Sequence, residues 1–328
     1  PQEMPELLHW FKWQAGITWL SGAMLLGIVY YMGGGAFLVD PTVSSLSPAA
    51  ATGVGIGTLV VSWLVYDLLW KSPLKQQPRL ALGVTFLYVL GVAFALTHLL
   101  SPRAAYLHVG AMLGTMMAGN VWMVILPSQR QLVGATERGE HPDPALAAKA
   151  KQRSIHNNYI TFPLLFIMVS NHFPGLYGHQ LNWIILGVIM LAGATVRHLM
   201  NIRFTFEGWV PAVSATVVIA IATLVLLTSY HAAPKAAVTG PVTFAAAHAI
   251  VSQRCVACHS KAPSDPAFVS APAGVTFDSP ENIRAFAPRI KARAVLTMSM
   301  PLGNKTGMTE TERAQLGQWI DAGARLTP

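Results

Sequence analysis

Seven apolar stretches divide the first 230 residues of this 328-residue chain. Each is about long enough to cross roughly 30 Å of hydrocarbon as a helix. They cover approximately Trp10 to Met32, Ala49 to Trp70, Arg79 to Leu100, Ala104 to Leu126, Ile155 to Phe173, His179 to His198 and Trp209 to Tyr230. The pattern predicts an all-α protein in which residues 1–230 form a polytopic transmembrane helix bundle.

Two polar segments interrupt or follow these stretches. Residues Pro127 to Ser154 are expected to form a long connection that ends in a short surface helix (PALAAKAKQR). Residues 231–240 are expected to be a tether, which separates the bundle from a second domain at residues 241–328. In that domain we expect a helix from Val242 to Arg254 and a closing helix from Thr309 to Ala322. A capping box from Thr309 to Glu312 opens the closing helix.

The glycine-rich run Gly53-Val54-Gly55-Ile56-Gly57 has no strand before it and no lysine after it. We therefore interpret it as a set of small residues for close helix packing and not as a phosphate-binding loop.

Composition supports a membrane protein, because 53% of the residues are hydrophobic and only 11% are charged. The net charge of +8 does not indicate nucleic-acid binding, because the basic residues divide into 12 before His231 and 10 after it, with no dense run. If residues 241–328 lie outside the membrane, seven crossings place eleven of those twelve basic residues inside and only Arg103 outside, which agrees with the positive-inside rule. Pro1 is not an initiator methionine, so we expect a processed or trimmed amino end.

The only two cysteines form the motif Cys255-Val256-Ala257-Cys258-His259. Two thiols at this spacing can form thioethers with the vinyl groups of haem, and the adjacent imidazole can become an axial iron ligand. The alternatives are a redox disulfide and half of a zinc site; however, there is no second cysteine pair, and a redox motif does not need the histidine. The motif predicts a class I cytochrome c-like domain with covalent haem c, located outside the bacterial cytoplasmic membrane, in the periplasm.

A methionine is the expected sixth ligand of that haem, and Met298, Met300 and Met308 are the candidates. We favour Met300, because Pro301 fixes the backbone directly after it and a Met/His pair raises the reduction potential of the haem. The alternative for each methionine is that it fills a gap in the core.

Ionisable and amide side chains near the ends of the apolar stretches fall into an outer and an inner layer. The outer layer holds four histidines, of which His98, His108 and His172 are candidate ligands of a b-type haem. The alternative for any one of them is an interfacial histidine bonded to water or lipid headgroups.

In the inner layer, Asn157, Asn158 and Arg197 offer amide groups and a guanidinium to a planar, nitrogen-rich anion. His156 is the candidate base, because an imidazole takes up protons near neutral pH. The alternative is a polar network that holds helices together.

Five segments of the chain resemble the membrane-bound urate oxidase family of the PuuD type, which joins membrane helices to a carboxy-terminal cytochrome c. They are HWFKW (9 to 13), HVGAMLGTMMAGNVW (108 to 122), HNNY (156 to 159), SNHFPGLYG (170 to 178) and MPLGNKTGMT (300 to 309). The resemblance implies oxidation of urate toward 5-hydroxyisourate, with electrons passing to haem c and onward to a respiratory-chain acceptor. It also implies one further helix before the segment that begins near Pro5.

Three functions remain open on the residues alone. The first is the urate-oxidising membrane enzyme, which the concentration of Asn, His and Arg at helix ends favours. The second is a membrane-anchored cytochrome c that serves as an electron-transfer subunit of a respiratory complex. The third is a haem or metal transport protein whose histidines line a path. If urate binds the inner layer, its electrons must cross most of the bilayer to the outer haem, so either a second haem lies between or the substrate binds near the outer face.

Overall fold

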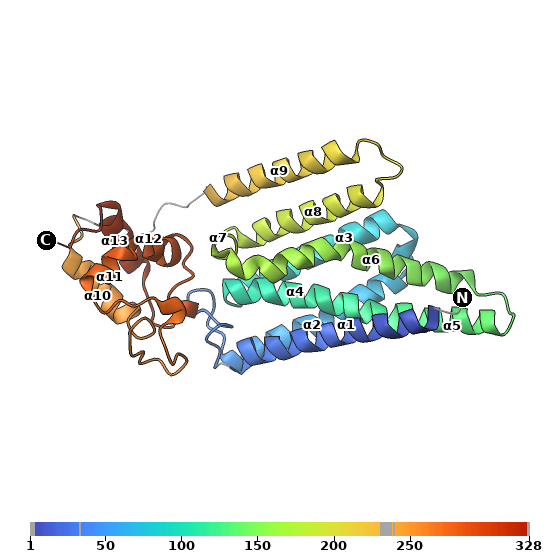
Figure 1. The fold of residues 1–328 in the computed structure, drawn as a ribbon, viewed down its shortest axis with the longest axis horizontal. Helices are drawn as coiled ribbons and strands as arrows, with labels where there is room; N and C mark the ends of the chain where they lie inside the picture. Colours follow the sequence, from blue (N-terminus) through green and yellow to red (C-terminus); the bar gives the residue numbers. More distant parts are fainter. Residues whose placement is uncertain (1–3, 33, 230–237, 239, 327–328) are drawn as a thin grey trace.

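The computed structural model describes residues 4–32, 34–229, 238 and 240–326, and every regular element in these residues is a helix. The helices form two parts (Figure 1). One is a bundle of long helices that run along a common axis, here called the helix bundle (residues 4–229). The other is a group of short helices at one end of that axis, here called the C-terminal region (residues 240–326).

Three of the long helices, α2, α4 and α6, start where the sequence supplies a capping side chain followed by proline. Ser47, Ser101 and Asp143 each accept a hydrogen bond from a backbone N–H of the helix that follows, and proline occupies the next position. The elements are α1 (Met4–Leu26) with the π-helical turn η1 (Gly27–Tyr31), α2 (Pro48–Lys71), α3 (Pro78–Thr97), α4 (Pro102–Gly119), the π-helical turn η3 (Asn120–Ile125), α5 (Leu126–Glu137), α6 (Pro144–Val169), the short α7 (Pro174–Tyr177), α8 (Asn182–Asn201) and α9 (Trp209–Ser229).

Within the described residues, five helical segments are long and apolar enough to cross a membrane. They are Pro48–Lys71, Pro78–Thr97, Pro102–Glu137, Asn182–Asn201 and Trp209–Ser229. These five are compatible with the expected multi-pass membrane protein. Helices α1 and α6 run beside them in Figure 1 but are not among the five, so a total of seven crossings stays a prediction.

The expected long connection at residues 127–154 is largely helical. Helix α4 continues through η3 and α5 to Glu137, and α6 begins at Pro144. The PALAAKAKQR segment is the start of α6 and not a separate surface helix, which corrects the sequence prediction. Alanine, lysine, glutamine and arginine are strong helix formers, and no glycine or proline occurs between Pro144 and Pro163 to end the helix.

Helix α4 forms the centre of the bundle. Its residues Ala105, Tyr106, Val109 and Met112 are fully buried. Helix α9 packs on α8 at the edge of the bundle and has no buried residue along its whole described length. Its exposed apolar side chains are compatible with a helix that crosses a membrane at the edge of the bundle.

The C-terminal region has its own apolar core, which includes Val251, Ile283, Leu316 and Trp319. Its main elements are α10 (Phe244–Arg254), α11 (Pro280–Ala285), α12 (Ala287–Ile290), the π-helical turn η6 (Lys291–Leu296) and α13 (Glu310–Asp321). The two helices predicted from the sequence are confirmed, and so is the capping box that opens α13. The predicted tether lies almost wholly outside the described residues.

The C-terminal region contacts the end of the bundle through close backbone approaches at two glycines. A Cβ atom on Gly178 would lie 2.2 Å from the carbonyl oxygen of Thr297, and one on Gly303 would lie 2.7 Å from that of Val39. Gly303 also has φ +54°, a left-handed conformation that glycine adopts without strain. Side chains at these two positions would therefore push the two parts of the molecule apart.

We predict that Gly178→Ala loosens this contact, because the added methyl group cannot fit against the carbonyl oxygen of Thr297. Hydrogen–deuterium exchange of residues 297–303 and 36–40 should become several-fold faster. Gly175→Ala is the matched control, because a Cβ there meets nothing within 4 Å. Equal exchange in the two variants would contradict the close contact.

Candidate functional site

The Cys-x-x-Cys-His motif follows the carboxyl end of α10. Both cysteines are free, and the backbone N–H of His259 donates to the carbonyl oxygen of Cys255 at 2.9 Å, which closes the turn. The Nδ1 atom of His259 lies 3.0 Å from the carbonyl oxygen of Val275. Because a carbonyl oxygen can only accept, Nδ1 carries the proton and Nε2 keeps its lone pair for a metal. Two thiols and an oriented imidazole are the donor set that a c-type haem needs.

The two thiols differ from those of a redox pair. Burial raises the pKa of Cys255 to about 12. Burial also raises the pKa of Cys258, whose sulfur lies 3.7 Å from a carboxylate oxygen of Asp265. Redox Cys-x-x-Cys motifs lower a thiol pKa instead. Within the described residues, no group of three or more His, Cys, Asp or Glu side chains is placed to hold a metal ion.

The three methionine candidates have different surroundings. Met298 is 48% exposed, and Met308 is 2% exposed. Met300 is half-buried and packs against the core of the C-terminal region, of which Cys255 is also a neighbour. The structure thus places Met300 on the same core as the first cysteine of the motif.

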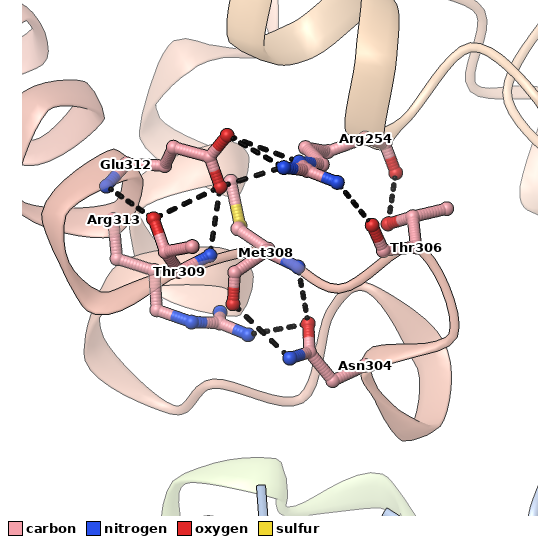
Figure 2. A network of polar contacts seen from close by, with 7 residues as sticks. All are labelled: Arg254, Asn304, Thr306, Met308, Thr309, Glu312 and Arg313. Atoms are coloured by element: carbon pink, nitrogen blue, oxygen red, sulfur yellow. Dashed lines mark hydrogen bonds and ion pairs between the residues drawn. The ribbon is translucent and has the colours of Figure 1, made fainter. Parts of the chain in front are cut away.

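A polar network holds the segment that follows Met300 (Figure 2). Arg254, the last residue of α10, pairs with Glu312 at 3.0 Å and also donates to the carbonyl oxygen of Thr306. Arg313 of α13 donates to the carbonyl oxygen of Met300 at 2.7 Å. The network ties the end of the helix before the motif to the start of the last helix, and so holds the backbone of residues 300–309 at Met300 and at Thr306.

A chain of hydrogen bonds lies inside the helix bundle. The Tyr66 hydroxyl is 2.7 Å from Nδ1 of His156 and accepts from the side-chain amide of Asn120 at 2.9 Å. The same amide of Asn120 also donates to Asn157 at 2.8 Å. The ring of Trp70 lies 4.1 Å from that of His156, centroid to centroid. His156 and Asn157, both predicted as site residues, therefore belong to one network.

A buried ion pair borders this network. Arg153 is 1% exposed, pairs with Asp67 at 2.8 Å and lies over the ring of Tyr66. Its Nη1 atom and the side-chain oxygen of Asn120 are both buried and have no hydrogen-bond partner among the residues that the structure describes. The guanidinium of Arg153 is thus shielded from solvent and depends on Asp67 for its counter-charge.

The other two predicted substrate residues meet on a different face of α6. The side-chain oxygen of Asn158 accepts from Nε of Arg197 and from the amide of Asn201, each at 2.8 Å. Successive residues of a helix point about 100° apart, so His156, Asn157 and Asn158 face different neighbouring helices. No hydrogen bond among the described residues joins this group to the network around His156. That all four residues bind one substrate stays a prediction.

The three outer histidines differ in burial and in their hydrogen-bond partners. His98 and His172 are exposed, whereas His108 is fully buried. Both ring nitrogens of His108 are engaged, with the hydroxyl of Tyr31 at 2.9 Å and the carbonyl oxygen of Ala104 at 2.8 Å. A b-type haem would need Nε2 of His108, which the Tyr31 hydroxyl occupies here. That haem stays a prediction.

Within the glycine-rich run of residues 53–57, Gly55 lies where a side chain would not fit. A Cβ there would lie 2.6 Å from Nε2 of His108, whereas Gly53 and Gly57 have nothing within 4 Å. The prediction of close helix packing is therefore confirmed at Gly55.

A cavity of about 680 Å³ lies where the C-terminal region meets the bundle. Its lining includes Arg103 and Tyr177 from the bundle, and Arg293 and Met300 from the C-terminal region. Sequence reasoning did not single out Arg103, Tyr177 or Arg293 for a functional role. Only Arg103 could have been recognised from the sequence, because it is the one basic residue of the bundle that the positive-inside pattern placed outside.

Comparison with known proteins identifies a family for most of the chain. The sequence model of the family described as urate oxidase N-terminal matches residues 1–229. Searches of curated proteins and of solved structures found no match.

We predict that Asp67→Asn destabilises the bundle by about 3–5 kcal/mol, because it leaves the buried charge of Arg153 without a counter-charge. The control is Lys71→Gln. It removes the other ion pair of Asp67, whose lysine is 55% exposed, and should cost less than about 1 kcal/mol. Denaturant unfolding of the detergent-solubilised protein measures both, and equal losses would show that the Arg153 pair is not critical.

Proposed function

This chain belongs to the urate oxidase N-terminal family, and from that premise we propose that it oxidises urate toward 5-hydroxyisourate. The electrons pass to a haem c attached to its own C-terminal region, and from there to a respiratory-chain acceptor. The observation that carries the haem part of this proposal is the arrangement at Cys255, Cys258 and His259. Both thiols are free, and the hydrogen bond to Val275 leaves Nε2 of the imidazole available for iron.

The reaction balances with water as the oxygen donor. The urate monoanion and one water give 5-hydroxyisourate, one proton and two electrons. A haem c supplies a one-electron acceptor, so two haems, or one haem used twice, are needed for each urate. The protein's own part is to bind the anion, remove a proton and hold the substrate within reach of that acceptor.

The proposed ligands of the haem iron are His259 and Met300. Met300 is favoured because it packs on the same core as Cys255 and because Arg313 holds its carbonyl oxygen. We further propose that residues 240–326 are a class I cytochrome c-like domain.

We propose that the bundle crosses the bacterial inner membrane seven times, with the C-terminal region in the periplasm. The five apolar helices and the distribution of lysine and arginine support this arrangement. Attachment of c-type haem outside the cytoplasmic membrane requires the same orientation.

Urate added without oxygen to the purified, oxidised protein should reduce its haem, with about one urate consumed for every two haems. Absorption of the haem measures the change, and mass spectrometry of the product checks the oxidation. Reduction by a quinol but not by urate would favour the alternative of a membrane-anchored electron-transfer subunit. A pyridine haemochrome spectrum of the same sample shows whether b-type haem accompanies haem c.

Replacement of the sixth ligand gives a second test. Met300→Ala should lower the reduction potential and convert the haem from low spin to high spin, because it removes the thioether. Met298→Ala is the control, since Met298 is largely exposed and should leave the spectrum unchanged. An unchanged low-spin spectrum in the Met300 variant would exclude Met300 as the ligand.

A further inference from the structure

The cavity between the helix bundle and the C-terminal region has the size and position of a small-molecule site. Its volume of about 680 Å³ falls within the range of ligand pockets, which often occur where two domains meet. Arg293 and Met298 in its lining are exposed, so the cavity is reached from water. Met300, the proposed iron ligand, also lines it.

The two parts of the molecule each contribute a guanidinium to this cavity. Arg103 belongs to α4 and Arg293 to the turn η6. Burial raises the pKa of the Tyr177 hydroxyl, while Arg103 and Arg293 both act to lower it. Both guanidinium groups therefore lie near the same phenol, and all three residues belong to the lining of one cavity.

The neighbours of Arg103 suit a planar, nitrogen-rich ring. Its Nε donates to the side-chain oxygen of Asn171 at 2.9 Å, and its guanidinium lies 5.2 Å from the centre of the Phe37 ring. Asn171 and Phe37 also line the cavity, as does Gln180. The site thus combines positive charge, amide groups and aromatic surface.

The acidic groups in the lining do not cancel this charge. Asp40 is buried, accepts hydrogen bonds from the backbone and hydroxyl of Thr42, and acts on the guanidinium of Arg313. Glu310 lies in the first turn of α13. Arg103 and Arg293 have no such carboxylate partner among the ion pairs of the described residues, so their charge is available to an anion.

We propose that this cavity binds the urate anion between Arg103 and Arg293. The proposal rests on the proposed function and deepens it by naming where the substrate sits. Guanidinium groups bind the carbonyl oxygens and the delocalised negative charge of urate, and the amides of Asn171 and Gln180 bind its ring N–H and C=O groups.

The position of the cavity removes the difficulty of moving electrons across the bundle. His156 lies 13 residues before the end of α6, which is about 20 Å along the helix. The cavity, in contrast, is lined by Met300 itself, so a substrate there lies next to the proposed iron ligand. His98 also lines the cavity, and because its Nδ1 lies 2.7 Å from the carbonyl oxygen of Phe94, its Nε2 keeps a lone pair that can accept a proton.

Binding of urate to the intact protein, with its haem reduced beforehand so that no oxidation follows, gives a readout that does not depend on turnover. Arg293→Gln and Arg103→Gln should each weaken binding about ten- to a hundred-fold in isothermal titration calorimetry. In the oxidised protein the same variants should need correspondingly more urate for half-maximal rate of haem reduction. Arg103→Lys keeps the charge and should recover part of the affinity.

The matched control is Arg289→Gln, which removes an exposed arginine of the same region that does not line the cavity. It should bind urate like the unchanged protein. Normal binding in both cavity variants, with loss in Arg197→Gln or Asn157→Ala, would overturn this inference in favour of the inner layer while leaving the proposed function standing. If the unchanged protein neither binds urate nor is reduced by it, the proposed function fails and this inference fails with it.

Discussion

The close approach between Gly178 and Thr297 is the constraint on which the arrangement of this protein depends. Because no side chain separates the two backbones, the C-terminal region sits directly on the end of the helix bundle. Gly303 gives a second such contact with Val39. Together they bring residues more than a hundred positions apart in the sequence, such as Arg103 and Arg293, to one cavity. The position of Arg103 and Met300 in one cavity follows from this docking and not from any single motif.

The polar residues inside the bundle contact mainly one another and not the C-terminal region. Tyr66, Asn120, His156 and Asn157 are joined by hydrogen bonds, and Arg153 is paired with Asp67, which leaves the side-chain oxygen of Asn120 and Nη1 of Arg153 as the atoms of this group without a partner among the described residues. In a low-dielectric interior such networks are favourable only when nearly every donor and acceptor has a partner. A network of this kind stabilises helix packing whether or not it also binds a ligand. The amides and the imidazole that made the inner layer look like a binding site are thus equally well explained by the packing of α2, α4 and α6.

Irregular helix geometry occurs next to His108 and in the network that contains Asn120. The π-helical turn η1 contains Tyr30 and Tyr31, which face His108, and η3 begins at Asn120. An extra residue in a helical turn rotates the side chains that follow, which is why π turns are frequent at functional sites. Hydrophobic periodicity averages over several turns, so it located the apolar stretches but could not reveal these local changes. The apolar pattern also did not reveal that α5 and the first turns of α6 extend the helices through the expected connection, because these segments are rich in polar and charged residues.

The sequence by itself determined the local features of this protein. Helix starts at Ser47, Ser101, Asp143 and Thr309 follow from capping residues that act on their own neighbours, and the Cys-x-x-Cys-His motif carries its donor set within five consecutive residues. Only the tertiary structure decided which distant side chains meet. Asn158 turns to Arg197 and away from Asn157, and Arg103 meets the C-terminal region, because helix rotation and domain docking depend on packing across the whole molecule. The sequence showed that Arg103 is the one basic residue of the bundle on the expected outer side. It did not show that Arg293 lines the same cavity.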